Sequence, residues 1–174
     1  MRLLQIRRGL IFDLFLFCYL VSIVRVLSPA LRYYGYMSNI SDQKLIQRAA
    51  VALNPQNLGD FYVADVACAL ISENGEIFTG TDIGTYLGIC AEQSAVSNMV
   101  QKSAPKISKI VAVWKDEHGE LFVIPPCGRC REFLRVMSQD NLEADIILGT
   151  DHVVKLKDLL PHHGWHAEKV QYSH

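Results

Sequence analysis

Apolar residues recur at helical spacing in three stretches of the chain, and short apolar runs typical of strands lie between them. The first helical stretch follows Ser41, a favourable N-cap residue, and stops at Asn54-Pro55. The second and third stretches begin at Cys90 and Cys127. The pattern predicts helices over 41–53, 90–100 and 127–137, strands over 62–71, 76–81, 107–115, 121–124 and 144–148, a short strand near 153–156, and a helical turn over 157–160.

Turn residues join these elements. Asn74-Gly75 is a strong hairpin signal between the first two strands. The stretch from Asp82 to Ile89 contains two glycines and is predicted to be a loop that leads to Cys90. The order α-β-β-α-β-β-α-β favours an α/β fold in which helices pack on the faces of one mixed sheet. Sites in such sheets gather where strands end and helices begin, which is where Cys90 and Cys127 stand.

Residues 1–36 differ from the rest of the chain. Arginines precede an apolar run over 10–24, and Asp13 interrupts that run. Three interpretations are open: a signal peptide, a membrane anchor, which needs about 20 apolar residues, and an extension upstream of a natural start at Met37. We favour the third, because the polar segment after Met37 leads directly into a capped helix. Residues 37–174 then form the domain, and contact with a membrane requires 1–36 to be retained.

The charge and the length of the chain exclude some classes of function. The 174 residues carry a formal net charge of −1, and the sequence pI is about 6.6. Proteins that bind nucleic acid usually show an excess of basic charge. A small neutral substrate therefore fits this chain better than a polymer, and the length suits one domain.

Five cysteines are present, and three of them have the spacing of metal ligands. Cys127 and Cys130 lie three residues apart at a predicted helix start, and Cys90 opens another helix, where the N-terminus stabilises thiolates. Three thiolates can hold a tetrahedral Zn²⁺ and leave the fourth position for water, whereas a structural zinc would need a fourth protein ligand. Cys68 is interpreted as a small buried hydrophobe. Reduced thiolates favour the cytoplasm over an oxidising compartment.

Glu92 lies two residues after Cys90, so its carboxylate can stand beside the metal and carry protons without binding the ion. The alternative is an acidic residue that only complements the helix dipole, an effect worth about 0.3–1 kcal/mol. Arg129 stands between the paired cysteines. It either donates to a ligand sulfur and offsets the thiolate charge, or it is a solvated surface arginine.

The C-terminal stretch from His162 to His166 contains three histidines but has no cysteine or acidic residue arranged beside it. We interpret it as a tail rather than a metal site. Trp165, within this stretch, is a candidate aromatic wall for the site of its own or a neighbouring chain, and ordinary surface packing is the alternative.

Cys90-Ala91-Glu92 followed by Pro126-Cys127-Gly128-Arg129-Cys130 resembles the zinc-dependent cytidine deaminase superfamily. The similarity is greatest to its free-nucleoside branch, which includes cytidine deaminases and blasticidin-S deaminases, and it covers most of residues 41–165. The resemblance implies a three-layer fold, a mixed β-sheet flanked by helices, and a homotetramer in which neighbouring chains complete each site.

The resemblance also implies roles for individual residues. Glu92 would pass a proton from water to N3 of a cytosine ring and then to the leaving amine, so that hydrolysis at C4 releases ammonia. Arg129 would offset the charge of the ligands. The expected Zn²⁺ ligands are Cys90, Cys127 and Cys130. The expected substrate contacts are Asp82, Ala91, Phe61 and Trp165.

The sequence departs from cytidine deaminases where they bind the sugar. Their ribose-binding Asn-x-Glu aligns with Asp82-Ile83-Gly84, which lacks the glutamate, and the loop that follows is shorter. Their stacking phenylalanine falls near Ala64, which leaves Phe61 or Tyr62 to replace it, and Gln93 stands where they often carry arginine. The zinc chemistry is therefore expected to be intact, with cytidine, deoxycytidine or an analogue such as blasticidin S as the substrate.

Two other functions compete with a nucleoside deaminase. A non-catalytic zinc-binding module would have no need of Glu92. A polynucleotide deaminase would need a basic groove and base-stacking aromatic side chains, which the near-neutral charge disfavours. We therefore expect a small-molecule substrate and no nucleic acid.

Overall fold

The computed structural model describes residues 40–84, 88–102 and 105–164. In chain order the elements within these ranges are α2 (Asp42–Ala52), β1 (Gln56–Asn57), β2 (Tyr62–Ser72), β3 (Ile77–Ile83), α3 (Ala91–Val100), β4 (Ile107–Lys115), β5 (Leu121–Ile124), α4 (Gly128–Met137), the 3-10 helix η1 (Gln139–Glu143), β6 (Asp145–Gly149), β7 (His152–Lys155) and the 3-10 helix η2 (Leu156–Leu159). Ser41 caps α2 by accepting a hydrogen bond from the Lys44 N–H.

The strands of the described residues form one mixed sheet of seven strands. The path β1-β2-β4-β6-β7 runs across it, with β3 paired to β2 and β5 paired to β4. Only the β4–β6 pair is parallel among these strand pairs. A parallel pair requires a crossover connection, and here that connection carries β5 and α4. The crossover places the start of α4 beside the central strand β4.

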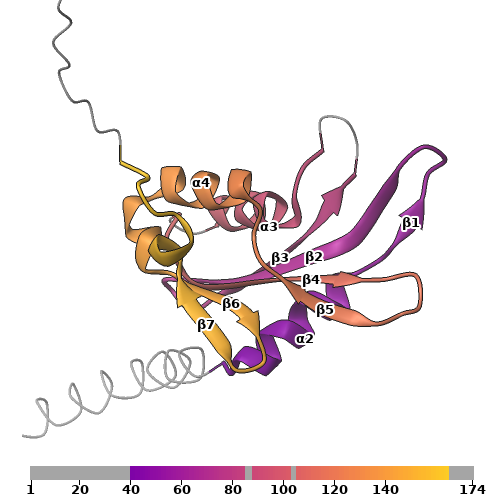
Figure 1. Ribbon diagram of the computed structural model, residues 1–174, viewed down its shortest axis with the longest axis horizontal. Coiled ribbons are helices and arrows are strands. Elements are labelled where there is room, and N and C mark those ends of the chain that lie inside the picture. Colours follow the sequence, from indigo (N-terminus) through magenta and orange to yellow (C-terminus); the bar gives the residue numbers. More distant parts are fainter. Residues whose placement is uncertain (1–39, 85–87, 103–104, 165–174) are drawn as a thin grey trace, which may run out of the picture. The chain divides into compact units, whose positions relative to one another are not determined.

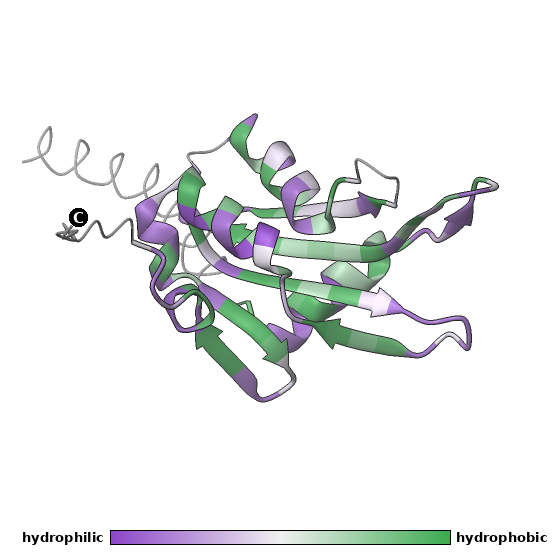
Figure 2. Cartoon of the chain, turned by 45° about the horizontal axis from the view of Figure 1, so that its top comes forward, coloured by the Kyte–Doolittle hydropathy of each residue, from purple (hydrophilic) through white to green (hydrophobic). Residues whose placement is uncertain are grey.

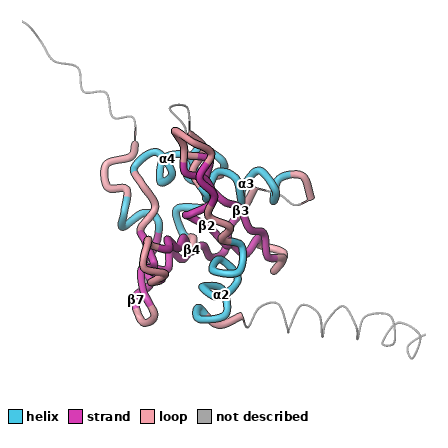
Figure 3. Tube along the Cα trace, turned by 90° about the vertical axis from the view of Figure 1, so that its right-hand side faces the viewer, coloured by secondary structure: helices cyan, strands magenta, loops and turns pink. Residues whose placement is uncertain are grey.

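Helices cover both faces of the sheet. Helix α2 lies on one face, and α3 and α4 lie side by side on the other, as Figures 1 and 3 show. The central strands are largely hydrophobic in Figure 2, because they are covered on both sides. The buried cluster beneath α3 and α4 includes Leu70, Met99, Leu134 and Ile146, each at most 2% exposed. The expected three-layer α/β fold is confirmed.

Helix α3 packs against β3 with almost no space between their backbones. A Cβ atom added to Gly80 of β3 would lie 2.2 Å from the backbone nitrogen of Ala95 in α3. Ala91 and Ala95 are themselves completely buried. Only small residues permit this approach, and it sets the position of the start of α3.

The structure corrects two details of the predicted elements. Asp82 and Ile83 belong to β3 rather than to a loop, because Ile83 pairs with Val63 of β2. Ile83 also exchanges backbone hydrogen bonds of 2.9 and 3.2 Å with Ile89. Strand β1 and the helix η1 were not predicted. Strand β1 has only two residues, so it has no periodicity, and its pairing with β2 alone makes it a strand.

The predicted domain boundary at Met37 lies outside the described residues, as does the apolar run over 10–24. In the part of the chain that the structure describes, no helix has the length and hydrophobicity that crossing a membrane requires.

Candidate active site

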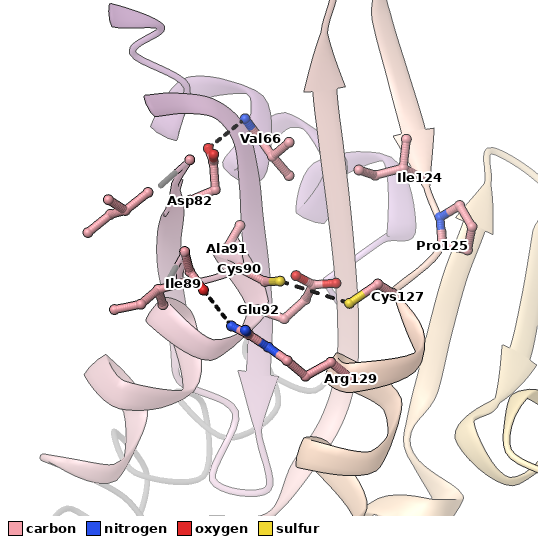
Figure 4. A pocket seen from close by; sticks show the side chains of 13 residues that line it. Val66, Asp82, Ile89, Cys90, Ala91, Glu92, Ile124, Pro125, Cys127 and Arg129 are labelled. Atoms are coloured by element: carbon pink, nitrogen blue, oxygen red, sulfur yellow. Dashed lines mark hydrogen bonds between the residues drawn. The ribbon is translucent and has the colours of Figure 1, made fainter. Parts of the chain in front are cut away.

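Three cysteine sulfurs meet where two helices begin. Cys90 is the N-cap of α3, Cys127 is the N-cap of α4, and Cys130 lies in the first turn of α4. Their Sγ atoms all lie within 4.8 Å of one another, and those of Cys90 and Cys127 are 3.9 Å apart. Cys90 follows the end of β3 by seven residues and Cys127 follows the end of β5 by three, and Figure 4 shows the two sulfurs facing each other.

This geometry fits zinc. Sulfur ligands lie about 2.3 Å from Zn²⁺, and a tetrahedron with that radius has edges of about 3.8 Å. The 3.9 Å separation between the Cys90 and Cys127 sulfurs matches such an edge. Within the described residues, this cluster is the one group of at least three potential ligands close enough to hold a metal. Three protein ligands are the number found in catalytic zinc sites, which keep an open position.

The thiols need a cation to be ionised together. Burial, followed by the charges of Glu92 and the two other cysteines, raises the pKa of Cys130 far above its ordinary value. Burial also raises the pKa of Cys90. Burial acts to raise the pKa of Cys127 as well, but the backbone N–H of Cys130 and the neighbouring thiols outweigh it, and this pKa is lowered. A bound dication would remove the cost of gathering these negative charges.

Glu92 lies in the first turn of α3 and is only 5% exposed. Its carboxylate points toward the Cys90–Cys127 pair in Figure 4. Burial raises its pKa above the ordinary value, although its own backbone N–H and the Cys130 thiol act in the opposite direction. A buried carboxylate beside three sulfurs that could hold a metal is able to take part in proton transfer. Complementing the helix dipole would not require this burial.

Arg129 makes contacts that neither sequence interpretation predicted. Its Nη2 donates to the Gly88 carbonyl and to Gln93 Oε1, both at 2.6 Å. These hydrogen bonds go to the opposite ligand loop and to α3, and not to a cysteine sulfur. Arg129 therefore links α4 to the segment that carries Cys90, and Gln93 is its partner.

A cavity of about 410 Å³ opens at the cysteine cluster. Glu92, Ala91 and two of the cysteines lie on its wall, and Arg129 borders it. Val66, Ile124 and Pro125 supply apolar surface, and Asp82 faces the same space (Figure 4). The volume falls in the range of small-molecule sites, with few polar groups in an apolar lining.

Asp82 is held in this cavity by an irregularity of β2. The β2–β3 register shifts between Val63 and Ala67, and Ala64 within that interval has a φ of 58°. The Val66 N–H donates to Asp82 Oδ1 at 3.0 Å. Burial raises the pKa of Asp82, the Val66 N–H acts to lower it, and the charge of Asp65 raises it further. A left-handed alanine is strained, and such strain is often found at functional sites.

The remaining predicted residues have different outcomes. Phe61 directly precedes β2 and is not among the described residues that line the cavity. Trp165 lies outside the described residues. Cys68 is completely buried in β2, as predicted. Val66 and Ile124 were missed, because an apolar residue in a strand gives no local sign that it faces a cavity.

Comparisons with known proteins agree with this site. Residues 40–143 match the family described as the cytidine and deoxycytidylate deaminase zinc-binding region. The chain is 33% identical over 103 residues to a blasticidin-S deaminase of Bacillus cereus, an alignment covering 55% of this chain and 74% of the relative. Its fold is similar to a cytidine deaminase of Mycobacterium leprae, with a TM-score of 0.57 and 24% identity over 71% of this chain and 100% of that one.

A second solved structure, cytidine deaminase of Mycobacterium tuberculosis, is 28% identical with a TM-score of 0.50, and the match covers 68% of this chain and 89% of that one. The family match spans more than half of the chain and includes both ligand loops. The chain therefore belongs to the zinc-binding cytidine and deoxycytidylate deaminase family.

Proposed function

We propose that this protein is a hydrolase that uses zinc to deaminate the cytosine ring of a free nucleoside or nucleoside analogue, with the release of ammonia. The observation that carries the proposal is the buried Glu92 carboxylate next to three cysteine sulfurs at one end of a cavity large enough for a nucleoside. A structural zinc site would require neither the carboxylate nor the cavity.

The roles follow from position. Cys90, Cys127 and Cys130 would hold Zn²⁺, which supplies Lewis-acid chemistry that lowers the pKa of a water molecule. Glu92 would accept one proton from that water and deliver it to N3 of the ring as the oxygen adds to C4. It would then take the remaining proton from the new C4 hydroxyl and give it to the amine, so that the C4–N bond breaks, ammonia leaves and a C4 carbonyl forms. Burial keeps this carboxylate away from bulk water, so it exchanges protons with the reacting atoms. Ala91 lines the wall beside the ring.

The residues that line the cavity indicate which groups of a substrate could be bound. Val66 and Ile124 offer apolar surface to a planar ring, and Asp82 offers a carboxylate oxygen to a hydroxyl or amine on the attached sugar. Its Oδ1 already accepts from the Val66 N–H, so the other oxygen is the one that would meet the substrate. Phe61 and Trp165 remain predicted contacts.

Two substrate types are compatible with this arrangement. Cytidine and deoxycytidine carry sugar hydroxyls that would reach Asp82. A blasticidin-S-type antibiotic is the alternative, and the 33% identity to a blasticidin-S deaminase supports it. Because no glutamate follows Asp82 two residues later in this chain, the sugar of the substrate need not be an ordinary ribose.

The proposal is tested by measuring ammonia release from cytidine, deoxycytidine, cytosine and blasticidin S with the zinc-loaded protein. Glu92→Gln should lower the rate by about 10²–10⁴-fold while zinc stays bound, since it removes the proton carrier without touching a ligand. Glu117→Gln in the exposed β4–β5 turn is the matched control and should leave the rate unchanged. Full activity of Glu92→Gln would refute the assigned role.

The same experiment separates the competing functions. Release from cytidine would show that Asp82 and its neighbours replace the missing sugar contacts. Release from blasticidin S alone would place the protein with the antibiotic deaminases. Bound zinc with no release from any of these substrates would favour the non-catalytic zinc-binding module.

We also propose an oligomeric state and a cellular compartment for this protein. Large apolar side chains, among them Ile83, Ile89 and Phe122, are 45–47% exposed, which supports an interface with other copies of the chain, and the oligomer that we propose is a homotetramer. Light scattering coupled to size exclusion would measure the mass directly. The cysteines of the described residues are free, as zinc ligands must be, which supports the cytoplasm as the compartment.

A further inference from the structure

Arg131 donates to both peptide carbonyls that flank Cys127. Its side-chain Nε donates to the Pro126 carbonyl at 2.8 Å, and its backbone N–H donates to the Cys127 carbonyl at 3.0 Å. The two carbonyls belong to the peptide groups on either side of the Cys127 Cα atom. Fixing both groups fixes the direction in which the Cys127 side chain leaves the backbone.

The same guanidinium reaches a second part of the chain. Arg131 Nη1 donates to the Leu159 carbonyl of η2 at 3.0 Å. Among the described residues, no carboxylate forms an ion pair with Arg131, so its side-chain hydrogen bonds go to backbone carbonyls. The planar fork of a guanidinium can hold two acceptors in a fixed relation, which a lysine cannot do.

Helix η2 is itself firmly attached to the sheet. Leu156 is completely buried, and its N–H donates to the Ala144 carbonyl at 3.1 Å. The Lys155 N–H donates to Asp158 Oδ2 at 3.2 Å, which caps the turn. The Lys155 ammonium pairs with Asp145 of β6 at 2.6 Å. The turn therefore provides a fixed anchor for Arg131.

We infer that Arg131 is a positioning residue that connects η2 to the second zinc loop and thereby determines how tightly Cys127 holds the metal. Cys127 is exposed and, as the N-cap of α4, makes no side-chain capping hydrogen bond of its own. Helix η2 lies beyond residues 40–143, the part matched by the family, so the inference assigns a role in metal retention to a segment outside that match. It holds whichever amine the site deaminates.

The test measures zinc affinity by competition with a chromogenic chelator at fixed pH. Arg131→Met keeps the aliphatic stem and removes the donors, and we expect its zinc dissociation constant to rise about 10–100-fold, the usual effect of removing a group that orients a ligand. Arg135→Met is the matched control on the same helix, because Arg135 pairs with Glu132 and not with the loop. Its zinc affinity should match that of the parent.

A second variant tests the connection to η2. Asp158→Ala removes the cap of the turn and leaves Arg131 in place, so it should weaken zinc binding by a smaller factor. In the double variant with Arg131→Met, the loss should not exceed that of Arg131→Met alone. Additive losses would overturn the connection, and parent-like zinc affinity in Arg131→Met, or an equal loss in Arg135→Met, would overturn the inference.

If Arg131→Met does not fold, Arg131→Lys is the variant that tests the inference. Lysine retains the charge but offers one nitrogen, which cannot hold the Pro126 and Leu159 carbonyls in the same fixed relation. The visible spectrum of the Co²⁺-substituted protein should shift, because it reports the arrangement of the thiolate ligands. A spectrum and a zinc affinity identical to those of the parent would also overturn the inference.

Discussion

Helices α3 and α4 present the same kind of ligand to the same metal, but different forces hold them. Helix α3 is placed by contact, since Gly80, Ala91 and Ala95 allow it to lie directly on β3. Helix α4 also buries Leu134 in the core, but polar side chains add hydrogen bonds at both of its ends, from Arg131 at its start and Asn141 near its end. A side-chain atom added at the α3–β3 contact would therefore collide with backbone atoms. At the ends of α4, by contrast, the loss of a hydrogen-bond donor would matter more than an added atom.

Asn141 is one of the side chains that position α4 by hydrogen bonding. It is completely buried, and its Oδ1 accepts from the Ile107 N–H at 2.8 Å. Its Nδ2 donates to the carbonyls of Leu134 and Pro105 at 2.9 and 3.0 Å. One side chain thus ties the end of α4 to the segment that leads into β4. In the described residues no buried side-chain nitrogen or oxygen lacks a partner.

Removing the hydrogen bonds that Asn141 makes at the end of α4 should give the largest loss of stability. Asn141→Leu keeps a similar volume but removes the partner of two buried backbone groups and of the half-buried Pro105 carbonyl, which should lower the free energy of unfolding by about 3–5 kcal/mol. Urea unfolding at saturating zinc measures the change. Asn98→Ala is the control, because Asn98 is exposed and donates one hydrogen bond to Thr79. A loss of similar size in the control would contradict the distinction.

A pair of glycine substitutions compares the two helices directly. Gly80→Ala forces a Cβ to within 2.2 Å of the α3 backbone and should cost about 1–3 kcal/mol of stability and displace Glu92 and Cys90. Gly128→Ala adds the same atom at the start of α4, where nothing lies within 4 Å, and should be neutral or slightly stabilising. Thermal unfolding measures both. Equal effects would mean that close packing does not distinguish the helices.

The smallest expected effect concerns the cavity beside α3. Burial and Asp65 raise the pKa of Asp82, so the protonated form favours the folded state. Its contribution to stability is complete below the ordinary pKa of about 3.9 and is lost as the pH rises through the higher folded pKa. Asp82→Asn should therefore be more stable than the parent at neutral pH, with the gap closing as the solution is acidified. A gap independent of pH would contradict this assignment.

Local sequence patterns were sufficient to predict several strands and the cysteine cluster. The strands Ile107–Lys115 and Leu121–Ile124 have the predicted limits, because alternation and turn residues mark both ends. The cysteine cluster was predicted because two ligands share one helix start and a third opens another helix. These features depend on neighbours within a few residues, and a sequence displays them directly.

Other features depend on residues far apart in the chain. Three features require segments that meet only in the folded protein: the extension of β3 to Ile83, the contacts of Arg129 with the opposite ligand loop and α3, and the cavity wall at Ile124. The same is true of the Arg131–Leu159 hydrogen bond, which joins residues 28 positions apart. An arginine on a helix has the same local pattern whether it faces solvent or a distant carbonyl.

The sequence by itself therefore predicted the main helices and strands, the three clustered cysteines and the carboxylate beside them, because helix starts and ligand spacing are local. The tertiary structure alone decided how the two ligand loops are held, which apolar residues line the cavity, and where Asp82 faces. Those properties arise from long-range packing and hydrogen bonding, for which the chain carries no local signal.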